Sequence, residues 1–420
     1  MAVNLLAVFD LIRKPEYQEF ITEIFKVLVP LYGKIKKVTP ENIMGSPGSL
    51  KIYTSYEVSA IGRGVGPRLE TDEWPIPGEL AFEQSWASPK RFLGKASLGM
   101  FTAAEVKGPG SLVNAVEKIL RRLIESATVS MGRMFMGDGT GKISVVTSVA
   151  GDVLTVASGG TVFLRPGDCL WAFYLAGTVP HYHRREQTTD LDHVYAFKIL
   201  DIDHAANQII VEDAGDIAAD DELYLEDCVS FSNGAITSKE WTGIQKIISN
   251  SGVLQNLDRD THRWWRSYVN TAQSGRDLTT TLLNTIIEEA YWGRGVDSIP
   301  EEFVCSPGVF IAWANELISK SVPTQSVPAT LGFAKAISYT FMGSEIRFWP
   351  DRGTPTGTMY GLIGDTLRCG ETVPFRIDTT GSALKVSDTH PRFDIVATAA
   401  GETIAEQPWL LLKVDELNEE

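Results

Sequence analysis

Hydrophobic residues recur along this chain with two different periods, and the longest helical pattern lies near the end of its first third. Over residues 111–136 the apolar positions return every three or four residues, which places them on one face of a helix. At 1.5 Å of rise per residue, a helix of this length spans roughly 39 Å, more than an average globular helix, and it suits a structural spine. The apolar stripe consists of Leu112, Val116, Ile119, Leu120, Leu123, Ile124, Ala127, Met131 and Met134.

The period falls to two after the glycine-rich run Gly137–Gly141. Alternating runs bounded by Gly or Asp turns are typical of strands, and they occur here at 143–146, 153–156, 195–200 and 208–211. We therefore predict a small, barrel-like all-β domain over residues 138–228, inserted after the long helix. Its expected core includes Leu154, Val156, Phe197, Ile199 and Ile210.

The chain before the long helix shows an arm and a hairpin. Residues 1–48 are predicted to be an N-terminal arm, with helical spacing that ends at Pro30. Residues 49–107 hold β-prone runs at 50–54 and 92–95 on either side of a polar, Gly/Pro-rich tip at 62–73, a pattern that predicts a projecting hairpin. Because an isolated hairpin is only marginally stable in water, we expect another chain to hold it.

The last part of the chain mixes helices and strands. A helix is predicted around 282–291, ended by Gly293 or Gly295. A second helix begins at Pro307, with Phe310, Trp313, Ala314 and Leu317 toward the core. The predicted strands are 302–305, 346–349, 359–362, 393–396 and 409–412. We divide the region into an α+β body at 229–390 and C-terminal strands and tail at 391–420.

Charge divides the chain in the same places. The 420 residues carry a net charge of −15, of which residues 1–137 contribute +3, residues 138–228 contribute −11 and residues 229–420 contribute −7. Carboxylates repel nucleic acid, so the acidic block is not expected to contact DNA. The first third is the part that can face a polyanion. Arg121 and Arg122, beside the apolar stripe of the long helix, suit either a partner or DNA contact or a solvated face, and the solvated face is favoured. Together with Arg133 they are the candidate DNA contacts.

The cysteines and the apolar runs exclude several classes of protein. Cys169, Cys228, Cys305 and Cys369 are far apart and form no CxxC pair, so we interpret them as reduced, buried thiols of a protein made in cytoplasm, without a zinc site of the usual spacing. No apolar run reaches the roughly 18 residues that span a bilayer. Asp10 interrupts the apolar length that a signal peptide needs.

Candidate ligand sites each have a simpler structural explanation. Gly137–Lys142 has the wrong spacing and the wrong element order for a phosphate loop, so we interpret its glycines as a helix end and a hinge. The His residues near Asp190 and Asp192 suggest either a transition-metal site or a solvated loop, and the loop is favoured. These histidines are His181, His183, His193 and His204.

The remaining candidates are a calcium loop, an interface and an active site. Asp201, Asp203 and Glu212 match three calcium-loop positions, but alanines replace other required residues, which favours a hairpin turn. The adjacent Trp264 and Trp265 suit either core packing or an interface anchor. No nucleophile elbow and no convergent carboxylate pair is present, so we expect neither an enzyme nor a cofactor.

Six local stretches, in this order along the chain, resemble the major capsid proteins of tailed bacteriophages with the Hong Kong 97-type shell fold. The first two belong to one hairpin segment, which runs from Gly64–Pro67 through Trp74–Pro77, and the others are Lys90–Lys95, Phe135–Gly141, Asp258–Arg266 and Phe303–Val309. The resemblance implies an α+β fold with an N-terminal arm, an extended E-loop, a peripheral (P) domain with a spine helix at 108–137, and an axial (A) domain. The β insertion is not part of the minimal fold.

The resemblance also implies a function. Such proteins assemble as hexamers and pentamers into an icosahedral shell around double-stranded DNA in the host bacterial cytoplasm, with scaffolding and portal proteins and sometimes a decoration protein as partners. An encapsulin-type compartment is the alternative. The arm is too short to contain a scaffold segment, which favours a separate scaffolding protein. Some relatives crosslink a loop Lys to an Asn of a neighbour; that pair is not matched here, and crosslinking stays open. The expected assembly contacts in the E-loop are Arg63, Arg68, Glu70, Asp72, Glu73 and Trp74.

Overall fold

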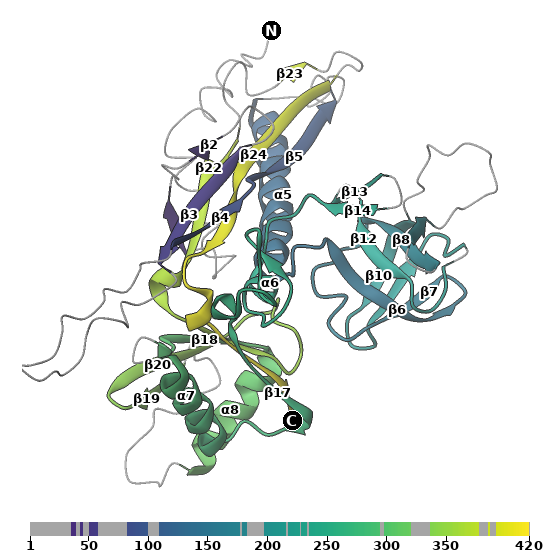
Figure 1. The fold of residues 1–420 in the computed structure, drawn as a ribbon. Helices are drawn as coiled ribbons and strands as arrows, with labels where there is room; N and C mark the ends of the chain where they lie inside the picture. Colours follow the sequence, from purple (N-terminus) through teal and green to yellow (C-terminus); the bar gives the residue numbers. More distant parts are fainter. Residues whose placement is uncertain are drawn as a thin grey trace, which may run out of the picture.

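The computed structural model is a mixed α+β structure built around one long helix (Figure 1). It describes residues 35–38, 43–44, 50–57, 82–99, 109–176, 179–182, 197–215, 217–226, 228–232, 235–294, 298–320, 337–377, 385–386 and 392–419. The predicted helix of the arm, the hairpin tip at 62–73 and His183 and His193 lie outside these residues.

The long helix α5 runs from Pro109 to Met136. It begins two residues before the start at Ser111 that the periodicity predicted, because proline is well tolerated in the first turn of a helix. Of the predicted apolar stripe, the buried residues are Leu123, Ile124, Ala127, Met131 and Met134. The helix lies along a sheet whose long central strand, β24 (Arg392–Ala405), pairs with β5 (Lys90–Gly99) and β22 (Leu367–Ile377) (Figure 1). Two shorter strands, β1 (Lys36–Val38) and β23 (Lys385–Val386), complete this sheet.

A three-stranded antiparallel sheet forms the base of the predicted hairpin. It consists of β2 (Ile43–Met44), β3 (Lys51–Glu57) and β4 (Phe82–Ala87). The pairing of β3 with β4 runs from Ile52 opposite Ala87 to Glu57 opposite Phe82. The two flanks of the predicted hairpin therefore do pair, while residues 58–81 between them lie outside the described part of the chain.

The described strands between Lys142 and Leu225 form a closed sheet with its own core. Its strands are β6 (Lys142–Ala150), β7 (Val153–Val156), β8 (Cys169–Ala176), β9 (Val179–Tyr182), β10 (Phe197–Asp203), β11 (Gln208–Val211) and β12 (Glu222–Leu225). The order β10-β11-β7-β6-β12-β8 closes on itself because β8 also pairs with β10, and we call this unit the barrel. Leu154, Val156, Phe197 and Ile199 are buried as predicted.

One predicted core residue of the barrel is wrong. Ile210 is partly exposed, whereas its neighbours Ile209 and Val211 are fully buried. Successive residues of a strand point to opposite faces, so an error of one residue in the phase exchanges the inner and outer side chains. In the run Gln208–Val211 three apolar residues are consecutive, and the sequence alone leaves this phase open.

The turn that resembled a calcium loop is a hairpin turn, as predicted. Strands β10 and β11 are antiparallel neighbours. The Asp203 carboxylate accepts hydrogen bonds from the backbone N–H groups of Ala205 and Ala206 at 2.9 and 3.1 Å, so it is satisfied within the turn. The glycines after α5 are likewise structural: Gly139 and Gly141 have φ of 72° and 82°, a conformation that favours glycine.

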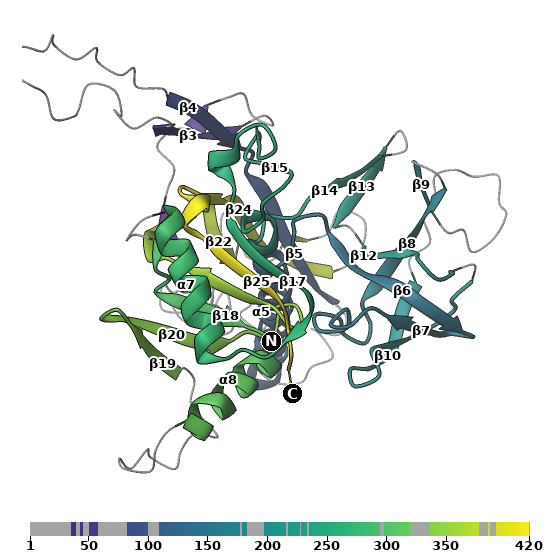
Figure 2. The ribbon, with the colours of Figure 1, turned by 60° about the horizontal axis from the view of Figure 1, so that its bottom comes forward.

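A second sheet lies beyond the C-terminal end of α5, while the barrel stands to one side of that helix (Figures 1 and 2). We call the second sheet and its helices the lower body. Its six strands follow the order β17-β25-β21-β18-β20-β19, and two helices pack their apolar sides on it. The bounds are β17 (Tyr268–Arg276), α7 (Thr280–Arg294), β18 (Glu302–Cys305), α8 (Pro307–Lys320), β19 (Ile337–Phe341), β20 (Ser344–Pro350), β21 (Met359–Leu362) and β25 (Leu412–Leu417).

One boundary in this region agrees with the prediction and another differs. The α7 helix continues through Gly293 and ends at Arg294, so of the two glycines predicted to end it, Gly295 is the one that follows the helix. Residues 408–410 form a 3-10 turn, and the strand predicted at 409–412 begins only at Leu412. Pro408 occupies the first position of this turn, where its fixed φ favours helical rather than extended backbone.

The short elements that connect these units are a hairpin, a helical turn and a second small hairpin. They are β13 (Val229–Ser232), β14 (Ala235–Ser238), α6 (Ile244–Ile247), β15 (Val253–Leu254), β16 (Leu257–Asp258) and the 3-10 turns η1 (Arg263–Trp265), η4 (Gly364–Thr366) and η5 (Pro408–Leu410). The elements from β13 to η1 carry the chain from the barrel back to the end of α5 and on to the lower body, whereas η4 follows β21 and η5 lies between β24 and β25.

All four cysteines are free thiols. Cys305 and Cys369 are buried as predicted, whereas Cys169 and Cys228 are only partly buried, because they lie at the margin of the barrel rather than in a core. Burial raises the pKa of the Cys228 thiol to about 12, which keeps it protonated and unreactive near neutral pH.

Candidate assembly surfaces

The two faces of the hairpin base differ in character. On one face Ile52, Ser85 and Ala87 are buried. On the other face Phe82 is 66% exposed, and the Lys51 ammonium lies 3.6 Å from the centroid of the Trp86 ring. A cation over an aromatic face is an attractive contact that keeps the charge at the surface. The outer face therefore offers aromatic and basic groups together.

The base is attached to the body through the loop formed by residues 249–266, which we call the platform. The Trp86 backbone N–H donates to the Gln255 carbonyl at 3.1 Å, and His262 Nδ1 lies 3.0 Å from Glu83 Oε2. Gln255 and Asn256, in the turn between β15 and β16, both have positive φ. This turn brings the Gln255 carbonyl against the outer edge of β4.

One buried arginine holds the platform together. Arg259 is 1% exposed, and its guanidinium donates to the carbonyls of Lys246, Ile247, Ser251 and Trp265. Burial lowers the pKa of Arg259 to about 10, which still leaves it charged at neutral pH. All four of these acceptors are main-chain carbonyls, so backbone dipoles compensate the buried charge of the guanidinium.

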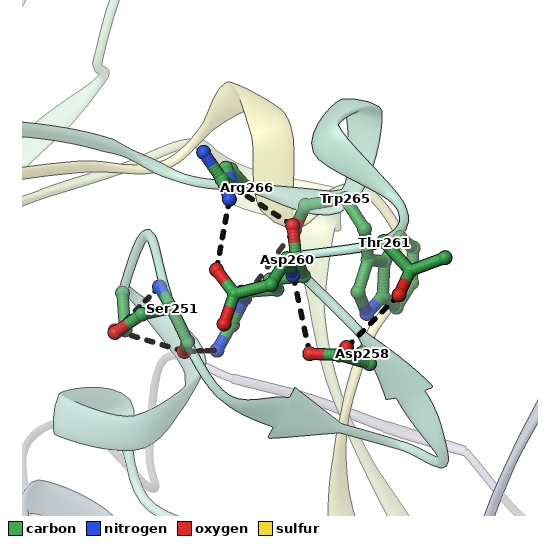
Figure 3. Close-up of polar contacts among 8 residues, drawn as sticks. Ser251, Asp258, Asp260, Thr261, Trp265 and Arg266 are labelled. Atoms are coloured by element: carbon green, nitrogen blue, oxygen red, sulfur yellow. Dashed lines mark hydrogen bonds and ion pairs between the residues drawn. The ribbon is translucent and has the colours of Figure 1, made fainter.

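The rim of the platform is closed by short-range polar contacts (Figure 3). The Asp258 carboxylate accepts from the Asp260 N–H at 3.1 Å and from the Thr261 hydroxyl at 3.0 Å. Arg266 donates to Asp260 at 2.8 Å. The Asp260 N–H is the main reason that the pKa of the Asp258 carboxyl lies below its usual value.

The predicted Trp264–Trp265 pair is part of this packing. Trp265 is fully buried, and its ring centroid lies 5.3 Å from that of Trp264 and 5.9 Å from that of Trp409. Its indole N–H donates to the Leu254 carbonyl at 3.2 Å. Of the two interpretations left open by the sequence, core packing is therefore correct for Trp265.

A second cluster of buried charges joins the end of α5 to the sheet. Arg133 is 7% exposed and pairs with Glu240, and its guanidinium lies 3.3 Å from Cys228 Sγ. Glu402 is 2% exposed and lies 3.8 Å from Lys90. Burial raises the pKa of the Glu402 carboxyl, and the Lys90 ammonium opposes that shift.

This cluster distinguishes Arg133 from the other two candidate DNA contacts. Arg121 and Arg122 are exposed on α5, as a contact with an external polyanion requires. Arg133 is not: its guanidinium is directed to Glu240 inside the molecule. In this subunit Glu240, more than 100 residues away in sequence, neutralises Arg133, and a DNA contact by Arg133 stays a prediction.

The sequence-predicted assembly contacts are not brought together by the described part of the structure. Arg63, Arg68, Glu70, Asp72, Glu73 and Trp74 all lie outside it. The platform residues were missed as contacts to the hairpin, although Asp258–Arg266 was singled out as a motif. The partners of the buried Arg259 are main-chain carbonyls. No acidic residue in the sequence pairs with it in these bonds, so charge patterns could not predict its role.

Other site classes find little support in the described ranges. Within them no group of three or more His, Cys, Asp or Glu side chains is placed to hold a metal, and His204 lies 3.1 Å from the Thr161 hydroxyl. No helix among the described residues is both long and apolar enough to cross a membrane.

Comparison with solved structures relates the whole fold to a viral shell. The capsid asymmetric unit of cyanophage A-1(L) matches with 12% identity and a TM-score of 0.50, over 93% of each chain. A native GTA particle capsid matches with 8% identity and a TM-score of 0.47, over 93% of this chain and 91% of that one. The SrpI encapsulin of Synechococcus elongatus PCC 7942 reaches 12% identity and a TM-score of 0.23, over 36% of this chain and 53% of its own.

No family model and no curated protein matches the sequence. The cyanophage likeness is at the level of fold, and it extends through nearly all of both chains. The chain thus has the mixed α+β fold of a phage capsid subunit, which fits the Hong Kong 97-like fold predicted from the sequence.

Proposed function

We propose that this chain is the major capsid protein of a tailed, double-stranded DNA bacteriophage, and that it assembles as hexamers and pentamers into an icosahedral shell around the genome. The observation that carries the proposal is the shared fold over 93% of this chain and 93% of the cyanophage capsid subunit. A likeness restricted to one common domain would support it far less. The proposed role is structural rather than enzymatic.

The parts of the fold have distinct roles in this proposal. Residues 1–48 are the N-terminal arm, 49–107 the E-loop and the start of the P-domain, 108–137 the spine, 138–228 an inserted domain, 229–390 the A-domain with P-domain elements and 391–420 the C-terminal strands. The E-loop, through Arg63 to Trp74, lies over a neighbouring subunit. The platform supports this role because it fixes the base of the hairpin to its own subunit through Gln255 and His262.

The test is electron microscopy of particles made by the full chain in bacteria, alone and together with the candidate scaffolding and portal proteins. Closed shells that package DNA in the presence of the portal are the expected result, with assembly in the bacterial cytoplasm and no membrane involvement. Small uniform shells filled with protein cargo would instead favour the encapsulin-type alternative. A monomer that remains compact at high concentration would contradict both.

The exposed arginines of α5 predict a charge effect on packaging. Arg121→Glu combined with Arg122→Glu places negative charge where the proposed inner face meets DNA, and phosphates repel carboxylates. We expect reduced DNA retention with little change in the thermal unfolding of the subunit, measured by DNA release on heating and by calorimetry. Arg263→Glu with Arg352→Glu is the matched control, because these exposed residues give the same change in net charge. Equal DNA loss in both double variants would contradict an inner position for Arg121 and Arg122.

The barrel is proposed to lie on the outer surface, where it can contact neighbouring capsomers or a decoration protein. The net charge of −11 over residues 138–228 disfavours a position beside packaged DNA. Its separate core, including Leu154, Ile209 and Val211, leads us to expect that residues 138–228 expressed alone unfold cooperatively with a β-type circular dichroism spectrum. A disordered fragment, or a barrel located on the inner wall of the particle, would contradict this placement.

A further inference from the structure

The hairpin of β19 and β20 ends in a turn whose sequence does not suit its backbone. Phe341 pairs with Ser344, so the loop between the strands has only two residues, Met342 with φ of 47° and Gly343 with φ of 86°. Two positive φ values define the turn type that favours Asn-Gly. A Cβ atom is poorly accommodated in this left-handed region, so methionine at the first position strains the turn.

Met342 is unlike the other strained positions. The remaining non-glycine residues with positive φ in the described part of the chain are all polar, namely Asn207, Asp220, Gln255, Asn256 and Glu416. The Met342 side chain is moreover 70% exposed, so packing within the subunit does not compensate the strain. A residue that is both strained and unburied in the free subunit points to a contact made elsewhere.

The surroundings of the tip have the character of an interface. The hairpin projects from the side of the lower body in both ribbon views (Figures 1 and 2). Strand β19 ends the sheet among the described residues, and its sequence Ile337–Phe341 contains no charge and no proline, the features that usually protect an edge strand from pairing. The most exposed large apolar side chain in the described ranges, Trp292 at 75%, belongs to the same body.

We propose that the Met342 tip is a contact between subunits, seated on a second copy of this chain. This proposal rests on the proposed function, since a shell surrounds each subunit with further copies. The chemistry favours a protein surface over nucleic acid, because the nearest charged residues of the hairpin, Glu345 and Arg347, lie 3.6 Å apart and neutralise each other. Methionine is flexible and enriched in protein interfaces.

The experiment compares three variants of the full chain. Met342→Asn suits the turn and removes the apolar contact, so it is expected to raise the thermal stability of the unassembled subunit while raising the threshold concentration for assembly roughly tenfold or more. Met342→Leu keeps an apolar side chain at the same strained position and is expected to assemble near the wild-type threshold. Glu416→Gly is the matched control, because it relieves positive φ at another exposed residue of the same body and should leave assembly unchanged.

Light scattering and sedimentation velocity give the thresholds. Assembly of Met342→Asn at the wild-type concentration would overturn the contact, and so would a Met342→Leu variant as defective as Met342→Asn. If the wild-type chain forms no closed particles under any condition, the proposed function itself fails, and this contact falls with it. If the wild-type chain forms shells and Met342→Asn forms them at the same threshold concentration, the Met342 contact is refuted while the proposed function stands.

Discussion

Replacing Gly243 with alanine is expected to destabilise the subunit by about 3–5 kcal/mol, more than most single substitutions. A Cβ at this position would lie 2.2 Å from the Gly137 carbonyl oxygen and 2.4 Å from that of Met134. Both oxygens belong to the C-terminal end of α5, which cannot shift without disturbing the packing of Phe135 on Trp241, whose ring centroids are 5.7 Å apart. Gly243 has φ of −98°, so the requirement for glycine comes from space alone.

Gly293→Ala is the matched control for this prediction. Gly293 lies within α7, and nothing lies within 4 Å of a Cβ added there. Alanine in a helix is favoured over glycine by about 0.5–1 kcal/mol, so the sign of the effect should reverse. Urea denaturation followed by circular dichroism measures both. A Gly243→Ala variant as stable as the wild type would show that the end of α5 is not packed as closely as the structure has it.

Replacing Arg259 with methionine is the second change with a large expected effect, about 3–5 kcal/mol. The substitution removes the guanidinium that donates to the carbonyls of Lys246, Ile247, Ser251 and Trp265. The Ile247 and Ser251 carbonyls keep the hydroxyls of Ser267 and Ser249 as donors, whereas those of Lys246 and Trp265 lose the Arg259 bond, and a buried acceptor without a donor loses a large part of its solvation. Lysine is expected to rescue little, because one ammonium cannot reproduce the planar geometry of the guanidinium.

The effect of Arg259→Met should extend to the hairpin base. The Trp86 N–H donates to Gln255 in the turn that Arg259 helps to hold, so amide hydrogen exchange at Trp86 is expected to accelerate in the unassembled subunit. Tryptophan fluorescence during denaturation reports stability through the Trp264–Trp265–Trp409 cluster. Arg263→Met, at an exposed position of the same platform, should change stability by no more than about 0.5 kcal/mol. If the amide exchange rate at Trp86 is the same in Arg259→Met as in the wild type, then Arg259 does not stabilise the hairpin base through the platform.

The candidate surfaces were predictable from the sequence only in part. The exposed pair Arg121 and Arg122 follows from the helical period, since both lie beside the apolar stripe and not in it. Arg133 has the same local pattern and yet is buried. The difference lies in Glu240, and no local pattern relates the two residues. The strain at Met342 was equally hidden, because a methionine before a glycine has no fixed turn type until two strands pair around it.

Local sequence patterns were sufficient to predict the long helix, the change of period at Gly137–Gly141 and the presence of strands in the acidic block, because these depend on propensities and spacings within a few residues. The contacts of those elements follow only from the folded chain: the closure of the barrel through β8 and β10, the burial of Ile209 and Val211, and the four carbonyls around Arg259. The reason is that burial and hydrogen-bond partners depend on contacts between residues distant in the chain. Local periodicity predicts that a segment is a strand, but it does not show which of the two faces of that strand is covered by the rest of the molecule.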